Sequence, residues 1–185
     1  MASVSGNVFL VGPMGSGKST IGRQLARALG LEFVDCDQAI EEQTGASVAL
    51  IFDIEGEAGF RSRERAMIEQ LSAREGIVLA TGGGAVLDPA NRAWLRARGQ
   101  VVYLACSVAQ QFERTRHSRH RPLLQAPDPE ARLAALLELR DPLYREVAHL
   151  VVNTDHRSVA AVVKELVRRL DRPEASQVKH GGKDA

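Results

Sequence analysis

The sequence predicts a doubly wound α/β domain, in which helices cover both faces of a central parallel sheet. Two features support this prediction: short β-rich runs alternate with helical patterns along the chain, and most of these runs are nearly continuous in apolar residues. Such alternation is typical of parallel strands joined by crossover helices, and unbroken apolar runs are expected where both faces of a sheet are covered. The 185 residues, 44% hydrophobic and 25% charged, suit one globular domain.

Five strands and five helices are expected from these patterns, and Gly30 is expected to end the first helix as its C-cap. The strands are expected at Val8–Val11, Glu32–Asp35, Ile77–Ala80, Val101–Leu104 and Leu150–Val152. The helices are expected at Ser19–Leu29, Phe60–Arg74, Val108–Arg116, Ala131–Glu138 and Ser158–Leu170.

Residues 1–170 are expected to form a single domain. Residues 171–185 lose the apolar periodicity and are expected to be a disordered tail. The segment from His117 to Pro129 carries three prolines and no regular periodicity. A mobile lid is expected there, at about residues 115–127.

Charge and cysteine usage exclude several classes of protein. The net charge of +1 argues against a nucleic-acid partner, because proteins that bind polyanions usually carry a large basic excess. Cys36 and Cys106 form neither a disulfide framework nor a metal-ligand cluster. The first residues lack a signal-peptide pattern, and no apolar run is long enough to cross a bilayer, so a cytoplasmic protein without a membrane partner is expected.

The strongest chemical signal lies between the first strand and the first helix. Residues 12–19 read Gly-Pro-Met-Gly-Ser-Gly-Lys-Ser and fit GxxxxGK[ST], the P-loop motif. In such a loop the glycines let successive backbone N–H groups face one anion, the lysine reaches the β- and γ-phosphates, and the final hydroxyl serves Mg²⁺. A glycine turn that only opens a helix is the alternative. The predicted nucleotide-binding residues here are Gly12, Gly15, Ser16, Gly17, Lys18, Ser19 and Thr20.

Two carboxylates follow the second strand. Asp35 and Asp37 are expected at the carboxyl edge of the sheet, where an open α/β sheet binds its ligands. Both side chains are therefore expected to face the phosphates or the acceptor. An alternative for Asp37 is that it caps a helix starting near Gln38, since aspartate is a favoured N-cap.

Arg61 and Glu64 lie three residues apart on a predicted helix and can meet on one face. The functional interpretation is that Glu64 holds the Arg61 guanidinium ready for a substrate carboxylate. A solvated surface pair is the alternative.

Three consecutive glycines, Gly82, Gly83 and Gly84, follow the third strand. Backbone that approaches a ligand too closely for any Cβ is the functional interpretation, and a flexible loop is the alternative.

With these features, the sequence resembles shikimate kinase from the first strand to the last helix. The resemblance is carried by the order and spacing of six segments: the P-loop with Thr20-Ile21-Gly22-Arg23, Asp35-Cys36-Asp37, Gly56-Glu57 to Phe60-Arg61, Gly82-Gly83-Gly84, Arg121-Pro122-Leu123-Leu124, and Arg140-Asp141-Pro142-Leu143-Tyr144. It implies a three-layer α-β-α P-loop kinase with a central five-stranded parallel sheet, a mobile lid and a substrate-binding helical segment at about residues 35–64.

The resemblance also implies an activity: ATP-dependent phosphorylation of the 3-hydroxyl of shikimate, in the pathway to chorismate and the aromatic amino acids. It implies that Asp37 binds the hydroxyls and orients or deprotonates the attacking one. Arg61 and Arg140 would clamp the carboxylate. The other expected substrate-binding residues are Phe52, Phe60, Gly82, Gly83 and Gly84.

On the nucleotide side, the resemblance implies ATP as co-substrate and Mg²⁺ as the metal ion. Ser19 would bind the metal directly and Asp35 through water, while Lys18 and Arg121 would join Asp37 as catalytic residues. Arg114 and Arg157 would flank the adenine. A monomer that binds only small molecules is expected.

Three alternatives remain open at this point. A related P-loop kinase acting on gluconate or a nucleoside monophosphate has the same phosphate-binding motif. A guanine-nucleotide switch is disfavoured because Asn153-Thr154-Asp155 lacks the lysine of the NKxD signature. A non-catalytic ATP-binding module is disfavoured because chemically competent side chains are retained at Lys18, Ser19, Asp37 and Arg121.

Overall fold

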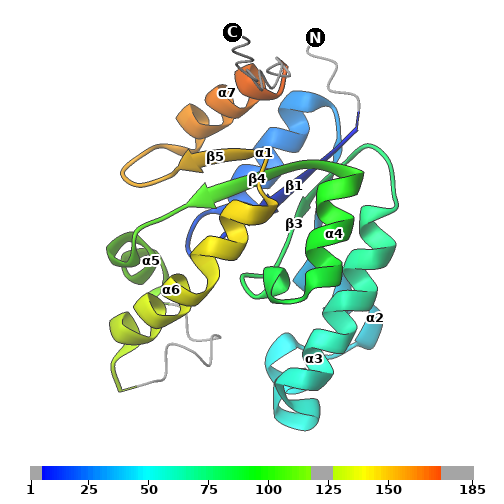
Figure 1. Cartoon of the computed structure of the whole chain (residues 1–185), viewed down its shortest axis with the longest axis vertical. Helices are drawn as coiled ribbons and strands as arrows, with labels where there is room; N and C mark the ends of the chain where they lie inside the picture. Colours follow the sequence, from blue (N-terminus) through cyan, green and yellow to red (C-terminus); the bar gives the residue numbers. More distant parts are fainter. Residues whose placement is uncertain (1–5, 118–126, 172–185) are drawn as a thin grey trace, which may run out of the picture.

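The computed structural model describes residues 6–117 and 127–171. In this part of the chain five strands form one parallel sheet in the order β2-β3-β1-β4-β5 (Figure 1). The strands are β1 (Asn7–Val11), β2 (Glu32–Asp35), β3 (Ile77–Ala80), β4 (Gly99–Ala105) and β5 (Leu150–Asn153). All five predicted strands are confirmed, and β1, β4 and β5 extend slightly beyond their predicted ends.

Helices connect the strands and lie on both sides of the sheet (Figure 1). Gly30 ends the first of them in the left-handed conformation, at φ 69°, and its N–H returns to the last turn as predicted for a C-cap. The helices are α1 (Lys18–Leu29), α2 (Cys36–Thr44), α3 (Val48–Ser72), the short 3₁₀ helix η1 (Ala85–Leu87), α4 (Pro89–Arg98), α5 (Val108–Thr115), α6 (Pro129–Val147) and α7 (Val159–Leu170).

The helical prediction was incomplete in four places. It missed α2 and α4, began α3 too late at Phe60, and ended α6 too early at Glu138. Gly56 explains the error in α3, because its non-helical backbone, at φ 71°, interrupts a helix that exists on both sides of it. In α6 the helix continues through Pro142, a residue that normally ends or kinks a helix.

The two faces of the sheet bury separate hydrophobic clusters, and β1 contributes to both. Val8 and Leu10 point toward the layer that contains α1 and α7. Phe9 and Val11 point toward the layer that contains α2, α3, α4 and α6. Side chains alternate along a strand, and every residue of β1 is buried, so this central strand supports both layers and the predicted three-layer architecture is confirmed.

A tight backbone contact fixes where the P-loop starts. Gly12 has φ 147°, and a Cβ at this position would lie 2.5 Å from the carbonyl oxygen of Leu104 in β4. Only glycine fits this conformation and this spacing. The loop after β1 is therefore held directly against the end of the neighbouring strand.

Candidate active site

The predicted site residues gather at the carboxyl edge of the sheet. The P-loop follows β1, Asp35 ends β2, and the glycine loop (Thr81–Gly84) follows β3. Because all the strands are parallel, these three segments leave the sheet at the same edge, as expected for a ligand site in an open α/β fold.

The P-loop presents backbone donors at the start of α1. Gly17 is the N-cap residue, at φ 89°, and no side chain among the described residues caps this helix end. The Oγ of Ser16 is buried and has no hydrogen-bond partner within the described chain. Lys18 Nζ donates to the carbonyl oxygens of Gly12 at 2.7 Å and Pro13 at 2.9 Å. The predicted phosphate-binding groups thus share one loop, whose N–H groups and partial positive charge suit an anion. Thr20 follows on the exposed side of α1.

Asp35 links the P-loop helix to α2. Its Oδ2 accepts a 2.6 Å hydrogen bond from the Ser19 hydroxyl, and its Oδ1 accepts from the Gln38 N–H at 3.2 Å. Asp35 is therefore the N-cap of α2, and the alternative that Asp37 caps this helix is wrong. β2 ends in extended conformation at Asp35 and the helix begins at the next residue, which places Asp37 inside the first turn.

Cys36, between the two aspartates, is fully buried in the core. Burial raises the pKa of its thiol, and the carboxylates of Asp37, Glu64 and Asp35 raise it further. Cys36 therefore packs in the core, and its thiol is a poor nucleophile because the raised pKa keeps it protonated.

Arg61 and Glu64 meet as predicted. Arg61 Nη1 donates to Glu64 Oε1 at 2.8 Å, and the Glu64 side chain is only 1% exposed. A surface pair is excluded by this burial, which also raises the pKa of Glu64 despite the nearby Arg61. The second carboxylate oxygen of Glu64 and Nε of Arg61 have no hydrogen-bond partner among the described residues. The Arg61 guanidinium lies over the Phe60 ring, with its Cζ 5.3 Å from the ring centroid. The rings of Phe60 and Phe52 pack together, with their centroids 4.7 Å apart.

The glycine loop lies against these side chains. A Cβ on Gly82 would lie 2.9 Å from Glu64 Oε2 and 3.1 Å from Asp37 Oδ1, and one on Gly84 would overlap the Arg61 guanidinium. The flexible-loop alternative does not explain these close approaches. Glycine is needed here because the acidic and basic side chains of the site approach the backbone.

Arg140 and Tyr144 reach the same loop from α6. Arg140 is 9% exposed, its Nη1 lies 3.5 Å from where a Gly83 Cβ would be, and its Nε has no partner in the described structure. Tyr144, one helical turn later, donates its hydroxyl to the Gly83 carbonyl at 2.6 Å. Sequence reasoning named Tyr144 only as part of a motif and gave it no role. Its spacing of four residues from Arg140 was the available signal.

The predicted nucleotide-side arginines have different surroundings. Arg114 donates to the carbonyl oxygens of Gly15 at 2.9 Å and Thr154 at 2.8 Å, so it joins the P-loop to the segment after β5. The Arg157 guanidinium forms an ion pair with Glu165 of α7 at 2.7 Å. In this structure Arg157 therefore makes a contact within the fold. Arg121 lies outside the described residues, as does most of the predicted lid.

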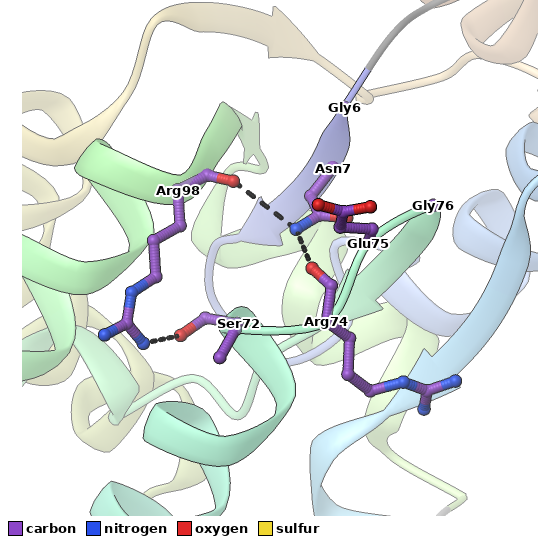
Figure 2. Close-up of a pocket in the computed structure, with 8 residues that line it drawn as sticks. Gly6, Asn7, Ser72, Arg74, Glu75, Gly76 and Arg98 are labelled. Carbon is purple, nitrogen blue, oxygen red and sulfur yellow. Dashed lines mark hydrogen bonds between the residues drawn. The ribbon is translucent and has the colours of Figure 1, made fainter.

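A hollow of about 800 Å³ lies at the opposite edge of the sheet, where the amino ends of the strands lie (Figure 2). Its polar groups bond to one another: Asn7 Nδ2 donates to the Arg74 carbonyl at 2.6 Å, and Arg98 Nη1 donates to Ser72 Oγ at 2.9 Å (Figure 2). The hollow is remote from the P-loop and from the glycine loop. Size alone therefore does not make it the active site.

Known proteins match this chain over most of its length. The family model described as shikimate kinase matches residues 14–171. The chain belongs to the shikimate kinase family. Shikimate kinase of Halorhodospira halophila is 61% identical over 88% of this chain and 92% of the relative, and that of Pseudomonas entomophila is 60% identical over 90% and 96%. The solved structure of shikimate kinase from Acinetobacter baumannii in complex with shikimate has a TM-score of 0.86 and 48% identity, covering 88% of this chain and 91% of that chain.

Membership of the shikimate kinase family settles the class of reaction. The chain is an ATP-dependent transferase that acts on shikimate, and the alternatives of a gluconate or nucleotide acceptor, a guanine-nucleotide switch and a non-catalytic module are set aside. Among the described residues, no helix is both long enough and apolar enough to span a membrane.

Proposed function

We propose that this site transfers the γ-phosphoryl group of ATP to the 3-hydroxyl of shikimate, giving shikimate 3-phosphate and ADP. One observation carries the proposal: the Arg61 and Arg140 guanidinium groups lie against adjacent residues of one glycine loop, and that loop lies beside the P-loop. A compact acceptor with a carboxylate and ring hydroxyls suits a cleft between these segments.

Arg61 and Arg140 bind the shikimate carboxylate. The Nε atom of each is buried without a hydrogen-bond partner in the described chain, and leaving a buried charged donor unpaired is costly. A substrate carboxylate supplies the missing acceptor, and arginine suits it because its N–H groups form a planar fork. Glu64 holds Arg61 in position, while Phe52 and Phe60 pack against the ring of the substrate.

Asp37 orients the attacking hydroxyl and accepts its proton. Its Oδ1 lies 3.1 Å from where a Cβ of Gly82 would be, so its carboxylate faces the glycine loop that lines the acceptor pocket. The backbone of Gly82, Gly83 and Gly84 contacts the ring hydroxyls. Positioning of the acceptor supplies much of the catalysis, because the transition state of phosphoryl transfer is loose and the protein forms no covalent bond to it.

Lys18 binds the β- and γ-phosphates together with the N–H groups of Gly12, Gly15, Ser16, Gly17, Ser19 and Thr20. Two loop carbonyl oxygens accept from its ammonium group, which lies within the loop that would hold the phosphates. Arg121 of the lid neutralises charge on the transferring group. Arg114 and Arg157 flank the adenine, and the contact of Arg114 with both the P-loop and Thr154 supports its place at that end.

Mg²⁺ fits the pair formed by Ser19 and Asp35. Magnesium prefers oxygen ligands and usually takes one or two protein side chains together with phosphates and water. The Ser19 hydroxyl and the Asp35 carboxylate are 2.6 Å apart at the start of α1 and can serve as direct and water-mediated ligands. When bound, the ion neutralises phosphate charge.

The organisation expected from the sequence completes the proposal. One kinase domain over residues 1–170 is proposed, with a substrate-binding segment at about 35–64. Most of the predicted lid at about 115–127 and of the predicted tail at 171–185 lies outside the described residues. The enzyme acts as a cytoplasmic monomer and binds no nucleic acid, in keeping with its net charge of +1.

The test is a coupled assay of ADP release, with NMR of the product to locate the phosphate. We expect turnover with shikimate and ATP, phosphate on the 3-hydroxyl, and loss of activity on chelation of Mg²⁺. Gluconate and a nucleoside monophosphate serve as rival acceptors. Turnover of either rival without turnover of shikimate would refute the proposal, and full activity in excess chelator would refute its metal part.

A further inference from the structure

The hydroxyl of Tyr144 is fixed in the core of the protein. The side chain is fully buried in α6, and the hydroxyl donates a 2.6 Å hydrogen bond to the carbonyl oxygen of Gly83. Burial raises the pKa of Tyr144 to about 12, so the hydroxyl keeps its proton near neutral pH and remains a donor. α6 is thereby tied to the glycine loop by a side chain that solvent does not reach.

The ring of Tyr144 is held from the central sheet. It stacks against Tyr103 of β4, with ring centroids 4.9 Å apart. The Tyr103 hydroxyl in turn donates to Asp141 at 2.6 Å, and Asp141 also accepts from Arg145 at 2.8 Å. The aromatic pair therefore has one hydroxyl directed to the glycine loop and one directed to the surface of α6.

Gly83 lies between the two halves of the site. A Cβ on Gly83 would be 3.5 Å from Arg140 Nη1, 3.6 Å from the Met14 backbone N and 3.7 Å from the Gly12 carbonyl oxygen. Gly83 thus lies next to both the guanidinium assigned to the acceptor and the backbone of the P-loop. A small shift of Gly83 would change the spacing between the two substrates.

The segment that follows the glycines is anchored from α4. Asn91 Nδ2 donates to the Ala85 carbonyl at 3.0 Å, and Arg92 Nη1 donates to the Val86 carbonyl at 2.7 Å. These bonds hold η1, but they act beyond the glycines. Tyr144 supplies the corresponding bond at Gly83 itself.

A small pocket of about 10 Å³ lies between α6 and the P-loop. Its lining includes Pro13, Met14, Arg140 and Tyr144. Arg140 and Tyr144 of α6 thus lie beside the P-loop.

We propose that Tyr144 is a positioning residue for phosphoryl transfer, which holds the Gly83 carbonyl and so sets the glycine loop between Arg140 and the P-loop. Tyr144 acts through Gly83 and through the neighbouring Arg140 guanidinium, which also interacts with the Tyr144 hydroxyl. Alignment of the acceptor hydroxyl with the γ-phosphate depends on that loop, and small misplacements of reacting groups are costly in rate. The inference rests on the role proposed above for Gly83 and Arg140.

Tyr144→Phe tests the inference, since it keeps the ring and the stack and removes only the hydroxyl. We expect the shikimate KM to rise about two- to ten-fold, the range that corresponds to the loss of one hydrogen bond, with a fall in kcat. The ATP KM should stay within about two-fold, because the P-loop retains its own contacts with the phosphates.

Tyr103→Phe is the matched control, because it removes the other hydroxyl of the same buried pair, whose acceptor is Asp141 rather than the loop. It should lower the melting temperature to a similar extent and leave the shikimate KM within about two-fold of wild type. Equal kinetic losses in both variants, or unchanged constants for shikimate in Tyr144→Phe, would overturn the inference.

Shikimate affinity and wild-type activity cover the cases in which the kinetics of Tyr144→Phe cannot be measured. If Tyr144→Phe melts below the assay temperature, the shikimate affinities of wild type, Tyr144→Phe and Tyr103→Phe are measured by calorimetric titration at low temperature. Equal affinities in wild type and Tyr144→Phe would again overturn the inference. Failure of the wild-type enzyme to phosphorylate shikimate would refute the proposed function instead, so the two failures are distinguishable.

Discussion

Asp35 and Asp37 have different surroundings although they are two residues apart. Asp35 ends β2 and accepts hydrogen bonds from the Ser19 hydroxyl and from the Gln38 N–H in the first turn of α2. Because that cap is already provided, the carboxylate of Asp37 is not needed to begin the helix. Its approach to Gly82 instead places it where an acceptor hydroxyl would bind.

Asp37→Asn should depress kcat while leaving ATP affinity nearly unchanged. The amide keeps the size of the side chain but cannot accept the hydroxyl proton, and a general base contributes about a hundred- to ten-thousand-fold. Calorimetry with ATP and steady-state kinetics measure the two quantities. Asp53→Asn, an exposed aspartate of α3, is the control and should behave as wild type. A large loss of ATP affinity in Asp37→Asn would contradict the assignment.

Glu64 should give shikimate binding an acid limit. Burial raises its pKa above that of an ordinary glutamate, so its proton binds at a higher pH in the folded protein than in the unfolded chain. Protonation weakens the hold on Arg61, and we expect the shikimate KM to rise as the pH falls through this raised pKa. Kinetics of wild type and Glu64→Gln across the acid range test this, because the shikimate KM of the variant should not rise as the pH falls.

The sign of the stability effect of Glu64 is opposite to that of a carboxylate with a lowered pKa. The contribution of Glu64 to the free energy of unfolding is fully present below the pKa that it has in the unfolded chain. It is lost as the pH rises through the higher pKa of Glu64 in the folded protein. Urea unfolding at several pH values should therefore show wild type losing stability relative to Glu64→Gln as the pH rises. The reverse trend would show that Arg61, rather than burial, controls this pKa.

At the scale of elements, the site depends on how closely the glycine loop approaches α2, α3 and α6. Asp37 of α2, Arg61 and Glu64 of α3, and Arg140 and Tyr144 of α6 all lie against the loop. None of the three glycines has a positive φ, so the need for glycine comes from the space available and not from backbone conformation. The loop can therefore serve as a fixed floor of the acceptor pocket.

Gly84→Ala should raise the shikimate KM strongly, because the new methyl group would overlap the Arg61 guanidinium and displace it. Loss of a charge-assisted contact predicts a rise of about ten- to a hundred-fold. Gly83→Ala should have the smaller effect, since the nearest atom to its Cβ would be 3.5 Å away. Shikimate kinetics on the two variants decide the point, and a larger loss in Gly83→Ala would show that the loop is not held as described.

At the scale of the whole molecule, the two edges of the sheet differ in the groups that they carry. The carboxyl edge carries the P-loop and the glycine loop, whereas polar groups around the hollow at the amino edge bond to one another. Asn7 is central to the amino edge: its amide donates to the Arg74 carbonyl, and its Oδ1 accepts from the Ile77 N–H at 3.2 Å. It joins the starts of β1 and β3.

Asn7→Ala should lower stability without changing catalysis. The substitution leaves buried backbone groups without partners, at a cost of about 1–3 kcal/mol in the free energy of unfolding. Urea denaturation measures this, and the constants for ATP and shikimate should remain those of wild type. Gln100→Ala, an exposed residue of β4, is the control and should change stability by no more than about 0.5 kcal/mol. A changed shikimate KM in Asn7→Ala would show that the two edges are coupled.

The sequence by itself determined the five strands, the P-loop with its strand and helix, and the family. These features depend on local patterns: apolar periodicity, glycine spacing and the order of short motifs along the chain. Local patterns misled at Gly56 and Pro142. Gly56 interrupts α3 with a non-helical backbone, although helix continues on both sides of it. α6 continues through Pro142, because tertiary packing outweighs the intrinsic preference of proline.

Only the tertiary structure decided which aspartate caps α2, how deeply Glu64 is buried and which carbonyl Tyr144 holds. Each of these depends on groups brought together by packing: Tyr144 and Gly83 are 61 residues apart in the chain and 2.6 Å apart in the fold. Burial and hydrogen-bond pairing of this kind are properties of the assembled layers. No local pattern encodes them, because the same residues on a solvated surface would have neither the same partners nor the same pKa.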